Sequence, residues 1–231
     1  DYSAWSGAIA GLRVVVTGGV DSDTGFPFSG QLSAPIEKAS GAQVVTPLTT
    51  LVDAMVSQGL ATDVNSAKQQ VAQTLGLTSD QLSTDPVAAL ASNPGIYTTG
   101  VALQRAVQML ASANAQSGES AHESQERVIH ALARAIRAQT STVDVSQLVS
   151  GLSLQNAPQA QVLASTITQS VQTGLDSSGH EGAKVALKAM DEVRTRMESD
   201  RDYRVATAAT KIDTERGKTS SRPYYELTQN S

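Results

Sequence analysis

The stretch Thr46-Pro-Leu-Thr-Thr-Leu-Val-Asp-Ala-Met-Val-Ser-Gln-Gly59 decides the fold class, because it carries a complete set of helix signals. A threonine that can cap a helix precedes a proline at the first helical position. Apolar residues then recur every three or four positions, as the buried face of a helix requires. They are Leu48, Leu51, Val52, Met55 and Val56. Gly59 suits the left-handed conformation that ends many helices. The stretch therefore predicts a helix that packs on a core.

The chain that follows repeats these signals. Asp63 is a predicted cap for a helix that Gly76 ends, and Ser120-Ala-His-Glu123 is a capping box. Cap-like residues or prolines also open further predicted helices, which are a short one at 87–91 after Asp85-Pro86, one at 100–115, one from Asp144 and one from Pro158. Asn93-Pro94-Gly95 is typical of a turn. The middle of the chain is therefore predicted to be a body of several helices.

The first 45 residues differ from this pattern. The run from Ile9 to Val16 is rich in β-branched residues and ends at Gly18-Gly19. Shorter strand-like runs follow a turn-rich segment. They predict a small hairpin-like β element of two or three strands. Because so small a sheet is not stable alone, we expect it to pack on the helices.

The predicted fold is mainly α, with a multi-helix body, a small N-terminal β element and an extended C-terminal tail. Four segments are expected, which are a β and turn-rich element at 1–45, a helical body at 46–175, a long charged helix at 176–216 and an extended tail at 217–231. The charged helix has acidic and basic residues in balance and a thin apolar stripe, so we expect it to be exposed and to break near Asp200.

Composition excludes several functions. The 231 residues contain no cysteine, so disulfides, thiolate metal sites and thiol catalysis are absent. The net charge is −5, which disfavours nucleic acid as a partner. The two long uncharged stretches, 86–104 and 145–175, hold too many polar residues to span a bilayer. Only 17 % of residues are charged, and the weakly charged polar surface that this implies is common in secreted bacterial proteins.

No catalytic motif is complete. His122 and His130 share a helix face but stand about 12 Å apart, too far for one zinc ion. We expect them to be exposed and paired with Glu126. Gly217-Lys-Thr219 resembles the end of a phosphate-binding loop, but position 212, where the leading glycine belongs, is Ile212. The sequence also lacks a nucleophile elbow, so we expect a protein that is not an enzyme.

Two weaker features point to binding. Asp21 and Asp23 alternate in a glycine-containing loop, which suits calcium, although a plain turn is the alternative. No other cofactor is expected. Aromatic residues cluster at the two ends of the chain, where they either close on each other within one molecule or form contacts between molecules. The candidate interface residues are Tyr2, Trp5, Phe26, Phe28, Tyr224 and Tyr225.

A resemblance connects these features. The segment from Gly18 to Pro35, the run Val44-Val-Thr-Pro-Leu-Thr-Thr-Leu-Val52 and the segment from Val71 to Leu77 together resemble a helical segment of large secreted bacterial surface proteins, including adhesin-like and calcium-dependent repeat proteins. The resemblance covers about residues 10–95 and carries no known catalytic residue. It implies an extracellular or cell-surface location in a bacterium.

We therefore expect a non-catalytic structural or adhesive protein that is a subunit or module of a bacterial surface fibre. Its N-terminal β edge and aromatic residues would meet the C-terminal segment of a neighbour, so its partners are copies of itself or other surface modules. An open strand edge can accept a strand from another chain. The alternative is a monomeric ligand-binding or calcium-binding module of a larger secreted adhesin.

Overall fold

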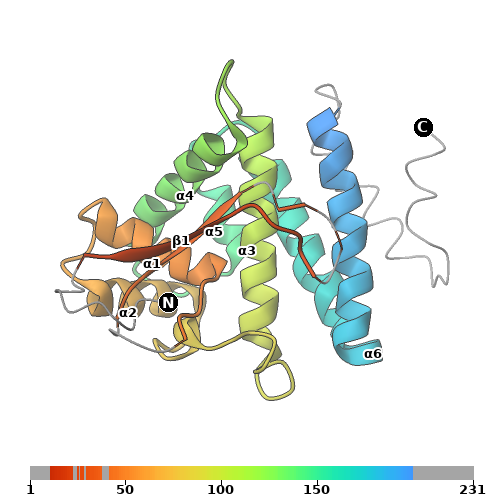
Figure 1. Cartoon of the computed structure of the whole chain (residues 1–231), viewed down its shortest axis with the longest axis horizontal. Helices are drawn as coiled ribbons and strands as arrows, with labels where there is room; N and C mark the ends of the chain where they lie inside the picture. The colour runs from red at the N-terminus through yellow and green to blue at the C-terminus, as the bar shows by residue number, and fades with distance from the viewer. Residues whose placement is uncertain (1–10, 23–24, 26, 29, 38–41, 200–231) are drawn as a thin grey trace.

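A computed structural model describes residues 11–22, 25, 27–28, 30–37 and 42–199. The predicted fold class is confirmed, because a small N-terminal sheet packs on a body of helices (Figure 1). The elements are β1 (Arg13–Thr17), β2 (Gln31–Pro35), α1 (Pro47–Ser57), α2 (Val64–Leu75), the 3-10 helix η1 (Gln81–Ser83), α3 (Pro94–Ala113), α4 (Ala121–Ala138), α5 (Val145–Ser150) and α6 (Ala157–Ser199).

Helix α1 lies at the centre of the N-terminal half. Thr46 caps it through a capping box with Thr49, and Pro47 occupies its first turn, as the sequence predicts. It contacts β2 as well as α2, α3 and α4. The predicted apolar face is buried except for Val56, which is half-buried, but Thr49, Thr50 and Asp53 on the other faces are buried as well. The helix is therefore covered nearly all round, because β2 lies over the side that would otherwise meet solvent.

Capping signals predict the starts of several helices correctly. Capping boxes begin α2 at Asp63, α4 at Ser120 and α5 at Asp144. The predicted helix at 87–91 is wrong, because this segment forms turns. The predicted turn at Asn93-Pro94-Gly95 is wrong as well, because α3 begins at Pro94.

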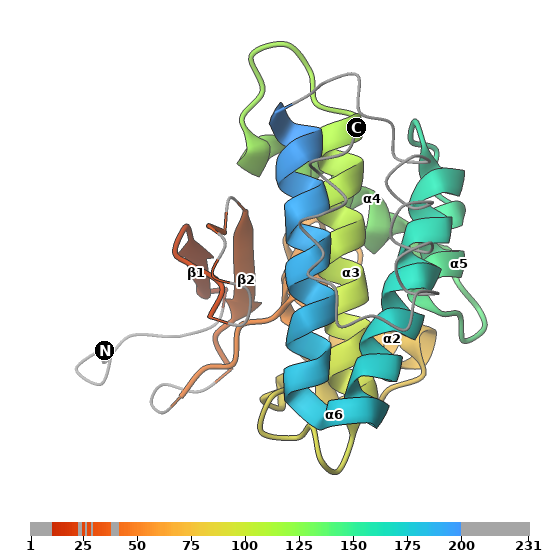
Figure 2. The ribbon, with the colours of Figure 1, turned by 90° about the vertical axis from the view of Figure 1, so that its right-hand side faces the viewer.

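Helix α6 is two helices joined by a sharp turn. Ser178 (φ −146°, ψ 20°) and Gly179 (φ 59°, ψ −142°) leave the helical region, and the chain then reverses direction (Figure 2). The first part ends just after residue 176, where the charged helix was predicted to begin. The predicted exposure of the charged helix is wrong in part, because Ala183 and Leu187 are buried in the core. The second part, residues 180–199, returns along α3, where Tyr97 and His180 make an edge-to-face ring contact. Residues 200–231, including the predicted break near Asp200 and the tail, lie outside the described residues.

The two strands form an antiparallel hairpin on one side of the helical body. The register pairs Arg13 with Pro35 and Thr17 with Gln31. In Figure 2, β2 lies between the helices and β1, so β1 is the outermost element on this side. Burial agrees with this order, because most of β1 is exposed and the second half of β2 is buried.

Candidate functional site

Strand β1 has one backbone edge that faces away from the rest of the hairpin. The Ile36 amide donates to the Leu12 carbonyl (2.9 Å), so Leu12 and Ile36 are a hydrogen-bonded pair of the two strands. Paired and unpaired positions alternate along an antiparallel ladder. The N–H and C=O groups of Arg13, Val15 and Thr17 therefore point away from β2. No backbone hydrogen bond joins them to any other segment that the structure describes.

The opposite edge of the hairpin is closed by α1. The Ser33 amide donates to Thr50 Oγ1 (2.9 Å), and Thr49 Oγ1 donates to the Ser33 carbonyl (2.9 Å). Pro35, at the next outward-facing position of β2, has no amide hydrogen to offer. The two threonines of the helix thus act in place of a third strand. Among the described residues, no backbone group covers the β1 side of this sheet.

The open edge is also apolar. Val15 and Val16 are each 42 % exposed, Leu12 is 40 % exposed, and Val20, just beyond the strand, is 67 % exposed. Soluble proteins usually protect such an edge with charged residues, prolines or bulges, since it is a template for pairing with another chain. Arg13 is the one charged residue of β1, and its side chain turns toward α1.

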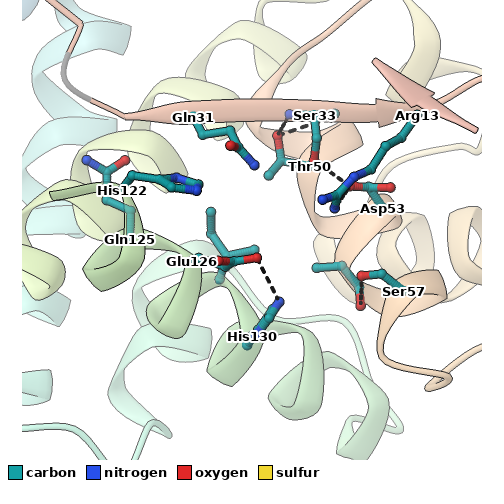
Figure 3. Close-up of a pocket in the computed structure, with 12 residues that line it drawn as sticks. Arg13, Gln31, Ser33, Thr50, Asp53, Ser57, His122, Gln125, Glu126 and His130 are labelled. Carbon is teal, nitrogen blue, oxygen red and sulfur yellow. Dashed lines mark hydrogen bonds and ion pairs between the residues drawn. The ribbon is translucent and has the colours of Figure 1, made fainter. Parts of the chain in front are cut away.

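A polar cluster around the buried Asp53 holds the hairpin on α1 (Figure 3). Ser33 Oγ donates a short hydrogen bond to Asp53 Oδ2 (2.6 Å), and Arg13 Nη1 lies 3.3 Å from the same oxygen. Asp53 is only 6 % exposed, so it needs both partners to offset the loss of water around its charge. The cluster connects one residue from each strand to one residue of α1.

Helix α4 forms the other wall of this cluster. His122, Gln125, Glu126 and His130 face Ser33 and Asp53 across a small space, as Figure 3 shows. The predicted pairing of Glu126 is found with His130, at 3.9 Å. The predicted exposure of His122 and His130 is wrong, because both are half-buried beside the hairpin.

The space between these walls measures about 20 Å³, which holds water but no organic substrate. The Ser33 hydroxyl donates directly to a carboxylate, whereas a serine nucleophile donates to a histidine base. Within the described ranges, no group of three histidine, aspartate or glutamate residues could hold a metal ion. The cluster is therefore suited to fastening the sheet.

The structure describes one of the two predicted calcium ligands. The Asp21 carboxylate lies 3.2 Å from Arg105 Nη2, and its side chain is 32 % exposed. The Gly25 amide donates to the Asp21 carbonyl (2.7 Å), a backbone bond that does not test the Asx-type turn given as the alternative. Asp23 lies outside the described residues, and calcium binding here stays a prediction.

Of the six predicted aromatic interface residues, the structure describes Phe28. Phe28 is half-buried, and its amide donates to the Gly19 carbonyl (3.0 Å), next to the end of β1. The other candidates, which lie outside the described residues, are Tyr2, Trp5, Phe26, Tyr224 and Tyr225.

Sequence reasoning missed the residues that join the sheet to the helix. Thr49, Thr50 and Asp53 follow one another at helical spacing on a single face of α1, and this stripe of short polar side chains was the available signal. A polar stripe of this kind is usually a solvated face. Only the position of β2 shows that it is buried.

No protein-family model, curated protein or solved structure matches the chain. None of the helices in the described part of the chain has the length and hydropathy required to cross a membrane. Function is therefore inferred from the strand edge and its surroundings.

Proposed function

We propose that the chain is a non-catalytic structural or adhesive protein of the bacterial cell surface, a subunit or module of an extracellular fibre. The observation that carries this proposal is the open, apolar backbone edge of β1. An extended segment from a neighbouring molecule would add to this edge as a third strand. The segment that supplies the added strand differs from the β1 edge that receives it, so each contact between molecules is head-to-tail. Repeated contacts that do not close into a ring give a filament.

The C-terminal segment of a neighbour is the proposed donor. Residues 217–231 include Tyr224-Tyr-Glu-Leu-Thr228, in which aromatic and β-branched residues with high strand propensity predominate. Alternate side chains of an added strand would lie against the exposed valines of β1. The backbone hydrogen bonds would supply affinity, and these side chains would supply the register.

The polar cluster supports a non-catalytic role. The Ser33 hydroxyl donates to Asp53, and the Asp53 carboxylate accepts from both strands of the hairpin. A catalytic carboxylate or hydroxyl must be able to reach a substrate. These groups instead hold the sheet in the orientation that leaves β1 outermost.

A proline at position 15 tests the strand edge. Val15→Pro removes an outward-facing amide hydrogen without touching the inward-facing ladder bonds, whereas Val15→Thr keeps the amide and the β-branched shape. We expect the full-length protein and Val15→Thr to form fibres in negative-stain images, and Val15→Pro to remain as single particles with an unchanged circular dichroism spectrum. Fibres of normal length from Val15→Pro would overturn the proposal.

Deletion of residues 217–231 tests the proposed donor. The shortened chain keeps β1, so it should remain monomeric alone but still cap the growing ends formed by the full-length protein. Light scattering measures both effects. An unchanged particle size for the shortened chain would exclude the C-terminal segment as donor, while leaving the result for Val15→Pro to decide on the edge itself.

A further inference from the structure

A cavity of about 470 Å³ lies between the hairpin, the start of α1, α3 and the second part of α6. Its walls include residues 18–22 after β1 and residues 45–48 before and within α1. Apolar side chains from four elements or loops line it, among them Phe28, Leu32, Ile96 and Leu187. This volume is within the range of sites that bind small organic molecules, and such sites are mostly apolar.

Gly100 shows that the side chains of the described residues leave part of this space open. It is buried in the middle of α3, yet a Cβ atom added there would have no atom within 4 Å. Glycine inside a helix is less stable than alanine, and protein interiors are normally close-packed. No atom of the described ranges lies close enough to Gly100 to explain the missing side chain. The glycine instead enlarges the cavity that it lines.

One polar group in the cavity wall can donate a hydrogen bond to a bound ligand. Gln104, one helical turn after Gly100, also lines the cavity, and its buried Nε2 donates to no acceptor in the described part of the chain. The neighbouring Arg105 is engaged, with Nη2 3.2 Å from Asp21 and Nη1 3.0 Å from Gln108. The Asp21 carboxylate balances the Arg105 charge, so the wall offers an amide donor without a net charge.

We infer that this cavity binds an uncharged, largely apolar small molecule that carries a hydrogen-bond acceptor. The apolar body lies against Gly100, and the acceptor receives a hydrogen bond from Gln104 Nε2. This inference is independent of strand addition at β1, since the cavity walls do not include the outward-facing edge of the strand.

Prodan, an uncharged naphthalene ketone whose emission moves to the blue when it leaves water, is a suitable probe. We expect the full-length protein to bind it saturably, with one site per chain and a blue shift. Gly100→Leu should fill the cavity and weaken binding about tenfold or more, while the matched change Gly95→Leu, at an exposed position of the same helix, should leave Kd unchanged. Equal binding by both variants would overturn the site.

Gln104→Leu gives a second arm that does not depend on how well Gly100→Leu folds. It keeps the volume of the side chain and removes the amide donor, so Prodan should bind more weakly and its emission should lose the hydrogen-bonded component. Unchanged affinity and emission would exclude Gln104 as the polar contact. Absence of saturable binding by the unmodified protein would contradict the inference as a whole.

Discussion

Asp53 is the residue on which the position of the hairpin depends. Its carboxylate is almost inaccessible to water and accepts hydrogen bonds from Ser33 on β2 and Arg13 on β1. A buried charge that loses its partners destabilises a protein more than an exposed pair does. Thr49 and Thr50 add bonds to the Ser33 backbone, so three residues of α1 hold a single position of β2.

Asp53→Ala should therefore lower the free energy of unfolding by about 2 kcal/mol, because the Ser33 hydroxyl then loses its charged acceptor. Urea unfolding measures the loss. Glu181→Ala is the control, since the Glu181 carboxylate forms an ion pair with Lys184 that is open to solvent and should change stability by less than about 0.5 kcal/mol. A similar small effect at Asp53 would show that the cluster does not fasten the sheet.

Glu119 makes stability depend on pH. The pKa of Glu119 is held below its ordinary value of 4.5, first by the hydrogen bond from Arg127 and then by the Gln116 amide. A carboxyl group with a lowered folded-state pKa stabilises the fold above pH 4.5, and this contribution disappears as the pH falls through the lowered pKa. The thermal midpoint of the unmodified protein should therefore exceed that of Glu119→Gln at pH 7, and the difference should shrink toward pH 3. A constant difference would contradict this assignment.

At the scale of elements, the sharp turn in α6 depends on glycine. Gly174 and Gly182 stand on either side of the turn, and a Cβ atom at either position would collide with the backbone of the other. The two parts of α6 can cross so closely only because both side chains are missing. Gly179 supplies the turn itself, with a positive φ that other residues rarely adopt.

Gly174→Ala should separate the two parts of α6 and destabilise the protein by about 1–3 kcal/mol, the usual range for overpacking. Gly100→Ala makes the same change in α3, where open space receives the methyl group, and should raise stability by about 0.5–1 kcal/mol. Thermal and urea unfolding measure both variants. Opposite signs support the account of the two glycines, and equal signs contradict it.

The elements could be predicted where the signal was local. Thr46-Pro47 and the capping boxes at Asp63 and Ser120 fix helix starts within a few residues of chain. The helix expected at 87–91 has the same kind of start but little core to pack on, since Val87 is 48 % exposed, and a short helix is unstable without packing. In α3, burial of Ile96 favours helix from Pro94 onward and overrides the turn signal of Gly95.

The candidate site was less predictable, because it depends on contacts between distant segments. The sequence indicates a β-branched run before Gly18 and a helix from Pro47, but neither shows that Thr49 and Thr50 close the β2 edge. Which strand is outermost follows from that contact. The cavity beside Gly100 forms where α1, α3 and α6 pack together. A single glycine in a helical segment of the sequence does not indicate such a cavity.

At the scale of the whole molecule, the hairpin is a small apolar attachment on a well-packed helical body. The core cluster runs from α1 through α6, whereas β1 contributes no fully buried side chain. A strand added to the edge of β1 would therefore leave the helical body unchanged. Because the hairpin contributes little to the core, the edge of β1 can stay exposed while the helical body remains folded.

Amide hydrogen exchange along β1, measured by NMR before assembly and by exchange trapping in assembled material, tests strand addition most directly. The amides of Val14 and Val16 face β2 and should be protected in both states. The amides of Arg13, Val15 and Thr17 should exchange freely in single molecules and become protected on assembly. Outward amides that still exchange freely in the assembled protein would contradict assembly through this edge.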